Sequence, residues 1–180
     1  VPGSMAEGIG GGVAWLDYDN DGDLDLAVSA SALPATLYEN IDGVLFADVF
    51  ALIPDTPPAE GGGVIAFDAD SDGDTDVFLL RQGRNVFFRN DGGIFVDATA
   101  EHLPGLGHWS ASAAAGDFDG DGDDDLLVGN YIAGVSFPEH QCARSALLEN
   151  DGTGRFIDRT LAWGVLGDGC TLGTAMSDYD

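Results

Sequence analysis

The chain has 180 residues, of which 44% are hydrophobic, and its 32 acidic residues against 6 basic ones give a formal net charge of −26. So few basic side chains cannot neutralise a phosphate backbone, which excludes nucleic acid as a partner. No run of about 18 apolar residues occurs, so no membrane span is expected. The apolar content is sufficient for the core of one sizeable domain.

The first predicted unit covers about residues 10–50 and alternates short apolar segments with polar turns. Such segments, with almost no helical periodicity, are typical of an all-β fold. In chain order the unit contains a strand of small residues at 11–16, an acidic loop at 17–25 and an apolar strand at 25–29. A strand that ends in a turn follows at 37–43, and a strand with an aromatic residue lies around Phe46. Four successive strands predict an antiparallel meander.

The same order of elements returns in two further units, at about residues 61–99 and 110–160, and a fourth unit starts at about 171–180. Repetition at this period suggests a solenoid or a propeller, and four antiparallel strands make one propeller blade. We therefore expect an all-β fold of three β-propeller blades plus the first strand of a fourth. Because a closed ring needs about four to eight blades, this ring is incomplete: either the sequence is a fragment, or the missing blades come from elsewhere.

The first strand of each unit is rich in glycine and alanine, as at 11–16, 62–67 and 111–116. In a propeller the innermost strands converge on the central axis, where bulky side chains would clash. These strands are therefore expected to be the innermost ones.

Each unit carries a nine-residue acidic loop with aspartate at positions 1, 3, 5, 7 and 9 and glycine at position 6. Carboxylates this close repel one another, so the folded loop needs a compensating cation. Flexible, oxygen-only ligation is what Ca²⁺ takes, and the glycine supplies the sharp turn around the ion. A single loop of this kind would also fit a solvated turn, whereas three in register favour calcium.

Positions 1, 3, 5 and 9 are expected to bind Ca²⁺ through their side chains. Position 7 is expected to bind through its backbone carbonyl, with its carboxylate as outer-shell charge. We predict three calcium sites and a truncated fourth, formed by Asp17, Asp19, Asp21, Asp23, Asp25, Asp68, Asp70, Asp72, Asp74, Asp76, Asp117, Asp119, Asp121, Asp123, Asp125, Asp178 and Asp180. An EF-hand requires an acidic residue at position 12; that position holds Val28, Leu79 and Val128, which excludes the motif.

Two cysteines, Cys142 and Cys170, are predicted to form a disulfide. Connections in a meander alternate between the two ends of the strands, so the acidic loops and the turns between third and fourth strands share one face. Cys142 lies in the long connection between the second and third strands of the third unit, and Cys170 lies in the link to the fourth. Both therefore belong to the opposite face, where a disulfide would join the third blade to the next. Two free buried thiols are the alternative.

The face opposite the acidic loops also collects basic and aromatic loop residues that could bind a ligand. They are found at 31–34, 81–84, His102, His108, Trp109, Glu139 and His140, and ordinary loop packing is the alternative for each. Four other aromatic residues, Trp15, Phe67, Phe118 and Trp163, are predicted to pack within the blades.

The repeats resemble the FG-GAP or VCBS repeats of integrin-alpha-type β-propellers over essentially the whole chain. The stretch from Leu147 to Asp158 is similar to the repeats of cartilage acidic protein-like and ASPIC/UnbV-type secreted proteins. The resemblance implies a seven-bladed, calcium-bound fold with an adhesive or ligand-binding function. It carries calcium ligation onto the aspartates named above, although this chain is shorter than such a ring.

These patterns favour a secreted or cell-surface calcium-binding module for adhesion or for protein or glycan interaction, located outside the cell or in the periplasm. Its calcium would be structural, and its protein or glycan ligand is expected on the face opposite the calcium loops. A second interpretation is a subunit of an extracellular filament or assembly that self-associates through open blade edges. A third is part of a propeller enzyme, but no nucleophile elbow or phosphate-binding loop is present, so no catalytic residue is predicted.

Overall fold

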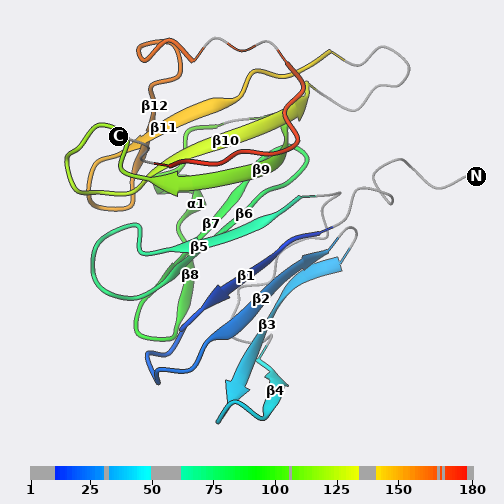
Figure 1. Ribbon diagram of the computed structural model, residues 1–180, viewed down its shortest axis with the longest axis vertical. Coiled ribbons are helices and arrows are strands. Elements are labelled where there is room, and N and C mark those ends of the chain that lie inside the picture. Colours follow the sequence, from blue (N-terminus) through cyan, green and yellow to red (C-terminus); the bar gives the residue numbers. More distant parts are fainter. Residues whose placement is uncertain are drawn as a thin grey trace, which may run out of the picture.

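The computed structural model describes residues 11–30, 33–49, 62–105, 107–133, 141–165, 167 and 169–177. These residues form three four-stranded antiparallel sheets and one helix of four residues (Figure 1). In each sheet the strands pair in chain order, which is the predicted meander. The all-β class and the four-strand blades are therefore confirmed.

The first sheet comprises β1 (Val13–Leu16), β2 (Asp25–Ala30), β3 (Leu33–Ile41) and β4 (Leu45–Asp48). The second comprises β5 (Val64–Phe67), β6 (Asp76–Leu79), β7 (Val86–Asn90) and β8 (Phe95–Asp97), after which the chain forms the helix α1 (Thr99–His102). The third comprises β9 (Trp109–Gly116), β10 (Asp125–Ile132), β11 (Ala146–Asn150) and β12 (Phe156–Asp158).

Strands β9 and β10 extend beyond the segments predicted for them. The second strand of the third unit, equivalent to 25–29 of the first, was predicted over 125–129, yet pairing continues through a register shift to Ile132, which lies opposite Trp109. The hydroxyl of Ser110 donates a 2.8 Å hydrogen bond to Asn130 Oδ1 within this extension. Buried polar pairs of this kind satisfy groups that would otherwise end the strand.

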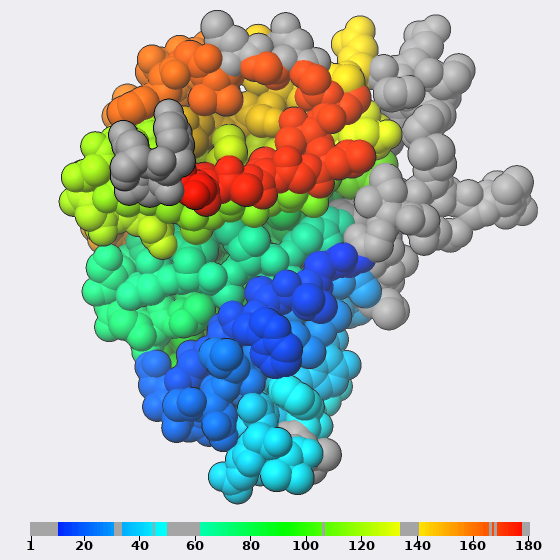
Figure 2. All heavy atoms as spheres, viewed as in Figure 1, coloured from blue at the N-terminus to red at the C-terminus, as the bar shows by residue number. Residues whose placement is uncertain are grey.

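The second sheet is buried on both faces, because it lies between the other two. Successive side chains of a strand point to opposite faces. Accordingly Val77 and Leu79 pack toward the first sheet in a core that includes Leu37, while Phe78 packs toward the third sheet in a core that includes Leu126. Each such buried side chain contributes about 1.5–3 kcal/mol, and Figure 2 shows the three sheets as successive bands in contact.

The first strands of the three sheets, β1, β5 and β9, lie side by side (Figure 1). Gly12, immediately before β1, approaches the second sheet so closely that a Cβ atom there would lie 2.8 Å from Gly63 Cα. A methyl group does not fit at that separation, which is the reason for glycine. The small residues expected here therefore allow the close approach of the two sheets just before β1 and β5. That these first strands are the innermost ones of a ring stays a prediction.

The predicted disulfide is present between Cys142 and Cys170, whose Cα atoms lie 4.5 Å apart. It joins the β10–β11 connection to the segment that follows the third sheet. That segment, residues 169–177, runs beside β9 (Figure 1), and a 2.9 Å hydrogen bond from Thr171 N to Asn130 O ties it to β10. No strand is assigned among residues 169–177, and Asp178 and Asp180 lie outside the described residues.

Candidate metal centres

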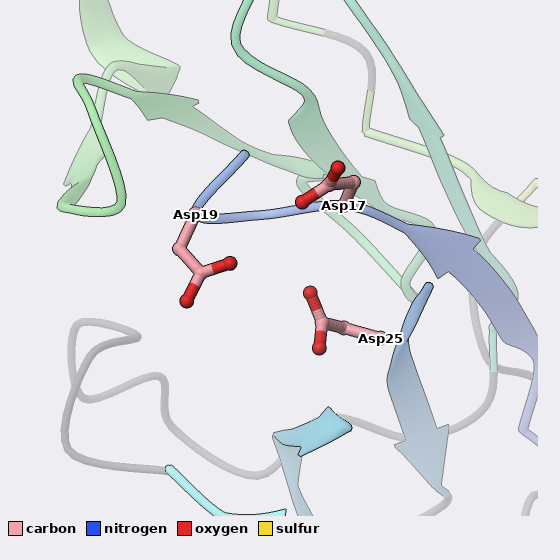
Figure 3. Close-up of side chains that lie close together, drawn as sticks. All are labelled: Asp17, Asp19 and Asp25. Carbon is pink, nitrogen blue, oxygen red and sulfur yellow. The ribbon is translucent and has the colours of Figure 1, made fainter. Parts of the chain in front are cut away.

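Three groups of aspartates converge where the first strand of each sheet passes into the second. In each group, positions 1, 3 and 9 of the acidic loop each offer one carboxylate oxygen, and these atoms lie within 4.8 Å of one another. The triads are Asp17, Asp19 and Asp25; Asp68, Asp70 and Asp76; and Asp117, Asp119 and Asp125. Figure 3 shows the three carboxylates of the first triad directed toward a common space.

Strand pairing brings the two ends of each loop together. Leu16, which precedes position 1, pairs with Asp25 at position 9, and the pairs Phe67 with Asp76 and Gly116 with Asp125 repeat this register. Position 1 therefore lies beside position 9 although seven residues lie between them in the chain. The antiparallel register itself creates the cluster.

The carboxylate at position 1 also folds the loop beneath it. In the first loop, Asp17 accepts hydrogen bonds from the backbone N–H groups of Asp21 at 3.1 Å and of Gly22 at 3.0 Å. Gly22 has a φ of 93°, a conformation that residues with a Cβ rarely adopt. Glycine at position 6 thus performs the predicted turn. Position 4 is left-handed as well, with a φ of 59° at Asn20, which the sequence did not indicate.

The carboxylate at position 5 lies outside each triad. Its Oδ1 accepts the backbone N–H of position 7, for example at 2.8 Å between Asp23 N and Asp21. The carboxylate at position 7 forms hydrogen bonds with other segments. In the second loop, Asp74 accepts 2.6 Å hydrogen bonds from Asn20 Nδ2 of the first loop and from Gly92 N. Ligation by positions 5 and 7 stays a prediction, which concerns Asp21, Asp23, Asp72, Asp74, Asp121 and Asp123.

The aspartate at position 9 is buried in every loop, with exposed fractions of 1% for Asp25, 0% for Asp76 and 0% for Asp125. Burial raises the pKa of Asp76 to about 7, despite hydrogen bonds from Asn90 N and Ala69 N that favour its charged form. Burial also raises the pKa values of Asp25 and Asp125. A carboxylate held away from water in this way is stabilised as an anion by a bound cation.

The second triad gives a test of whether a cation fits. Asp68 Oδ1 and Asp70 Oδ1 are both buried and have no hydrogen-bond partner. An unsatisfied buried polar atom costs about 1–3 kcal/mol, and more when it is charged. Carboxylate oxygens alone suit a hard divalent ion such as Ca²⁺ rather than a softer transition metal. The residues present therefore fit calcium.

A basic side chain lies beside the second triad. Arg89 Nε is 4.0 Å from Asp70 Oδ2, while the guanidinium forms two hydrogen bonds with Asp91 at 2.8 and 2.9 Å. The residue at the same point of the repeat is Glu39 in the first sheet and Glu149 in the third. Hence the three candidate centres differ in local charge.

Three asparagines next to the triads were not recognised from the sequence as more than turn residues. Asn40, Asn90 and Asn150 each end the third strand of a sheet and donate their backbone N–H to the aspartate at position 9, at 2.8, 2.7 and 2.7 Å. Their recurrence at one point of all three units is the signal that could have revealed them.

Several residues expected on the opposite face are engaged in packing. Trp109 is only 4% exposed and packs with Ile132, so it is not a surface aromatic. His102 Nδ1 lies 2.9 Å from Gly154 O, in the β11–β12 turn on the side of the metal loops, so its placement on the opposite face was wrong. Residues 31 and 32, Glu139 and His140 lie outside the described residues.

The fold and the triads together define a module of repeated propeller-type blades with acidic loops between their first and second strands. Residues 68–128 match the family model of the FG-GAP-like repeat. The resemblance to FG-GAP repeats is therefore confirmed for this segment. The match does not extend to the finer ASPIC/UnbV type, which stays a resemblance.

Among curated proteins no match is found. Among solved structures, the chain is similar to the crystal structure of the V. cholerae biofilm matrix protein Bap1, with 22% sequence identity and a TM-score of 0.42. The similarity covers 81% of this chain and 19% of that protein. No helix in the described residues has the length and apolar character needed to cross a membrane.

Proposed function

We propose that this chain is an extracellular, calcium-stabilised propeller module that serves adhesion or the binding of proteins or glycans, without catalysing a reaction. The observation that carries the calcium assignment is the pair of buried, unpartnered oxygens on Asp68 and Asp70 inside a three-carboxylate cluster. The recurrence of the same triad in all three sheets supports it further.

Calcium would act on stability by relieving charge repulsion. Three Ca²⁺ ions would reduce the formal charge from −26 to −20, at the points where the carboxylates are closest together. A ligand that binds only the folded chain stabilises it by about 2.7 kcal/mol per site at a concentration of 100 times Kd. Binding and folding are thus coupled.

The disulfide between Cys142 and Cys170 supports an oxidising location, where calcium is also plentiful. We assign the ligand-binding surface to the face opposite the metal loops. Two connections meet there: Gly83 N donates a 3.0 Å hydrogen bond to His108 O, which places residues 81–84 beside the segment that enters β9. Loops held together on a rigid sheet are suited to recognition.

Calorimetric titration of the chelator-treated chain with calcium tests the metal assignment. Uptake of calcium at all three triads and a higher unfolding temperature are expected, and both should vanish when Asp19, Asp70 and Asp119 are replaced by asparagine. A control variant carries Asp42→Asn, Asp48→Asn and Asp97→Asn, which remove the same charge outside the loops. Equal behaviour of the two variants would refute calcium ligation by the triads.

A second candidate function is self-assembly, favoured by the outer face of the first sheet. Val13, Trp15 and Phe46 on this face are 62%, 57% and 44% exposed. At the equivalent positions of the second sheet, Val64 and Phe95 are only 5% and 4% exposed because the first sheet covers them. The exposed face therefore has the composition of a blade interface, and its proposed occupant is a second copy of this chain.

Light scattering over a range of concentrations tests this candidate. The chain should gain mass as its concentration rises, whereas Trp15→Ser combined with Phe46→Ser should stay monomeric. Val44→Ser is a suitable control, since Val44 is 88% exposed and lies in the β3–β4 turn, outside the strands that form this face. A wild-type chain that is monomeric at every concentration would exclude assembly through this face.

A further inference from the structure

A buried asparagine connects the first two metal loops. Asn90 is 0% exposed, and its Nδ2 donates to Tyr18 O at 2.8 Å, in the first loop, and to Thr75 O at 3.2 Å, in its own loop. Its backbone N–H donates to Asp76 Oδ1 at 2.7 Å. A single side chain thus contacts position 2 of one loop and position 8 of the next, and its backbone holds a triad aspartate.

Asn150 makes the same connection between the second and third loops. It is 1% exposed, and its Nδ2 donates to Ala69 O at 2.7 Å and to Asp124 O at 3.1 Å. Its backbone N–H donates to Asp125 Oδ1 at 2.7 Å. The two asparagines therefore occupy equivalent positions with equivalent partners.

The residue at position 2 completes a continuous series of hydrogen bonds, because its C=O accepts from the asparagine and its N–H donates to the position 9 aspartate of the same loop. Ala69 N donates to Asp76 Oδ2 at 2.9 Å, and Tyr18 N donates to Asp25 Oδ2 at 3.0 Å. In order, the chain of hydrogen bonds passes through Asp125, Asn150, Ala69, Asp76, Asn90, Tyr18 and Asp25. Every position 9 carboxylate lies on it.

The turns of one sheet also pack on the loop of the preceding sheet. A Cβ atom on Gly93 would lie 3.7 Å from Asp19 Cβ, and one on Gly154 would lie 3.5 Å from Asp70 Cβ. Asn90 Oδ1 fixes the first of these turns by accepting Gly93 N at 2.8 Å. Position 3 of a triad is therefore in contact with the turn that the next asparagine holds.

We propose that Asn90 and Asn150 are positioning residues that couple the three cation sites, so that an ion bound in one loop raises the affinity of the neighbouring loop. The inference rests on the proposed calcium binding. Its physical basis is that each asparagine satisfies its amide hydrogens only while the preceding loop holds its folded shape.

The coupling is positive for the following reason. Without an ion, repulsion among the carboxylates favours looser forms of the first loop in which Tyr18 O is out of reach, and in these forms a buried amide hydrogen of Asn90 is unpaired at a cost in free energy. An ion in the first loop fixes Tyr18 O, and the ordered Asn90 then holds Asp76 in place for the second ion. By linkage, an ion in the second loop favours the first to the same extent.

Asn40 provides a matched comparison within the same chain. It donates its backbone N–H to Asp25 Oδ1 and its Nδ2 to Leu24 O, and its Oδ1 accepts Gly43 N at 3.0 Å. These are the bonds that Asn90 makes within its own blade. The bond to a neighbouring loop is the difference, since Nδ2 of Asn40 has Leu24 O as its partner among the described residues.

Site-resolved calcium titration by NMR tests the proposal on the full chain. The amides of Gly22, Gly73 and Gly122 report the three loops separately, because each donates a 3.0 Å hydrogen bond to position 1 of its own loop. Disabling the second site with Asp70→Asn should weaken calcium binding reported by Gly22 by about fivefold or more, the size of a typical coupling.

In an Asn90→Ala background, Asp70→Asn should no longer change the titration of Gly22. In an Asn40→Ala background the effect should persist, although this variant loses the same bonds within its blade. Asn150→Ala should uncouple Gly73 from Gly122 and leave the first pair coupled, which keeps the test decisive if Asn90→Ala fails to fold.

Three independent titrations in the wild-type chain, or equal uncoupling by Asn40→Ala and Asn90→Ala, would overturn the proposal while leaving calcium binding intact. A chain that binds no calcium in any loop would overturn both the proposed function and the coupling.

Discussion

Arg89 Nε lies 4.0 Å from Asp70 Oδ2, so a cation of the protein already neutralises part of the second triad. This side chain repels a divalent ion that enters the site. At a separation of about 8 Å in water, a unit charge and a divalent ion repel each other by about 1 kcal/mol. We therefore expect the second loop to bind calcium more weakly than its own triad alone would allow.

Arg89→Glu should strengthen calcium binding in the second loop by about threefold or more, measured as the titration of the Gly73 amide. Arg84→Gln is the control, because Arg84 donates to Thr99 O rather than to a loop carboxylate. An unchanged or weaker titration of Gly73 in Arg89→Glu would show that the bonds between Arg89 and Asp91 matter more than the charge.

A comparison of Asp119 and Asp121 in the third loop distinguishes a metal ligand from a residue that only holds the turn. Asp119 belongs to the triad, so Asp119→Asn should lower the unfolding temperature when calcium is present and change little after chelation. Asp121 accepts the backbone N–H of Asp123 at 3.1 Å and lies outside the triad. If Asp121 is a ligand, Asp121→Ala should lower the unfolding temperature in the same calcium-dependent way.

Thermal unfolding of Asp121→Ala with calcium and with a chelator decides the role of position 5. A loss of stability that occurs only when calcium is present supports the predicted ligation by Asp121. Equal losses in both conditions would refute it and leave Asp121 as a turn residue only.

Much of this fold could be predicted because the same short pattern of turn and strand residues recurs in each unit. Position 6 of the loops requires the left-handed conformation observed at Gly22, and a meander necessarily places Cys142 and Cys170 on one face, where they form a disulfide. Both arguments depend on chain order and local geometry. For that reason they needed no knowledge of how the sheets pack.

Features that depend on packing between sheets were missed. Asn90 and Asn150 reach carbonyls that lie 72 and 81 residues away in the chain, and no local pattern marks such partners. Trp15 packs within its blade as predicted, against Phe46 of the same sheet, but its exposed fraction of 57% was not foreseen. Burial of an aromatic residue at a blade surface depends on whether a neighbouring blade covers it.

Removal of the disulfide should destabilise the chain without changing the metal loops. Cys142 and Cys170 are 28 residues apart, and a closed loop of that size stabilises the fold by about 3 kcal/mol. For a chain of this length, the double variant Cys142→Ser with Cys170→Ser should unfold about 6–12 °C lower. Calcium affinity should be unchanged, since the bond lies on the opposite face.

Calorimetric melting of the double variant, with the oxidised chain as reference, checks this prediction. Mass spectrometry of a nonreduced digest provides the control, because it should contain the peptides of Cys142 and Cys170 linked together. An unfolding temperature equal to that of the oxidised chain would contradict the stabilising role.

Asp76 should give the stability of the calcium-free chain an unusual pH dependence. Burial raises its pKa to about 7 in the folded state, from an ordinary value of 3.8, so between these values the folded chain holds a proton that the unfolded chain has released. Its contribution to stability is therefore complete below the ordinary value and is lost as the pH rises through about 7. Calcium reverses the trend, because the ion binds the deprotonated carboxylate and stabilises the folded chain more at higher pH.

Unfolding temperatures measured from pH 4 to 8, with a chelator and with calcium, should thus change with pH in opposite directions. Asp76→Asn should flatten the chelator series, whereas Asp42→Asn, in an exposed turn, should leave it unchanged; a chelator series that is as steep in Asp76→Asn as in the wild type would contradict this origin.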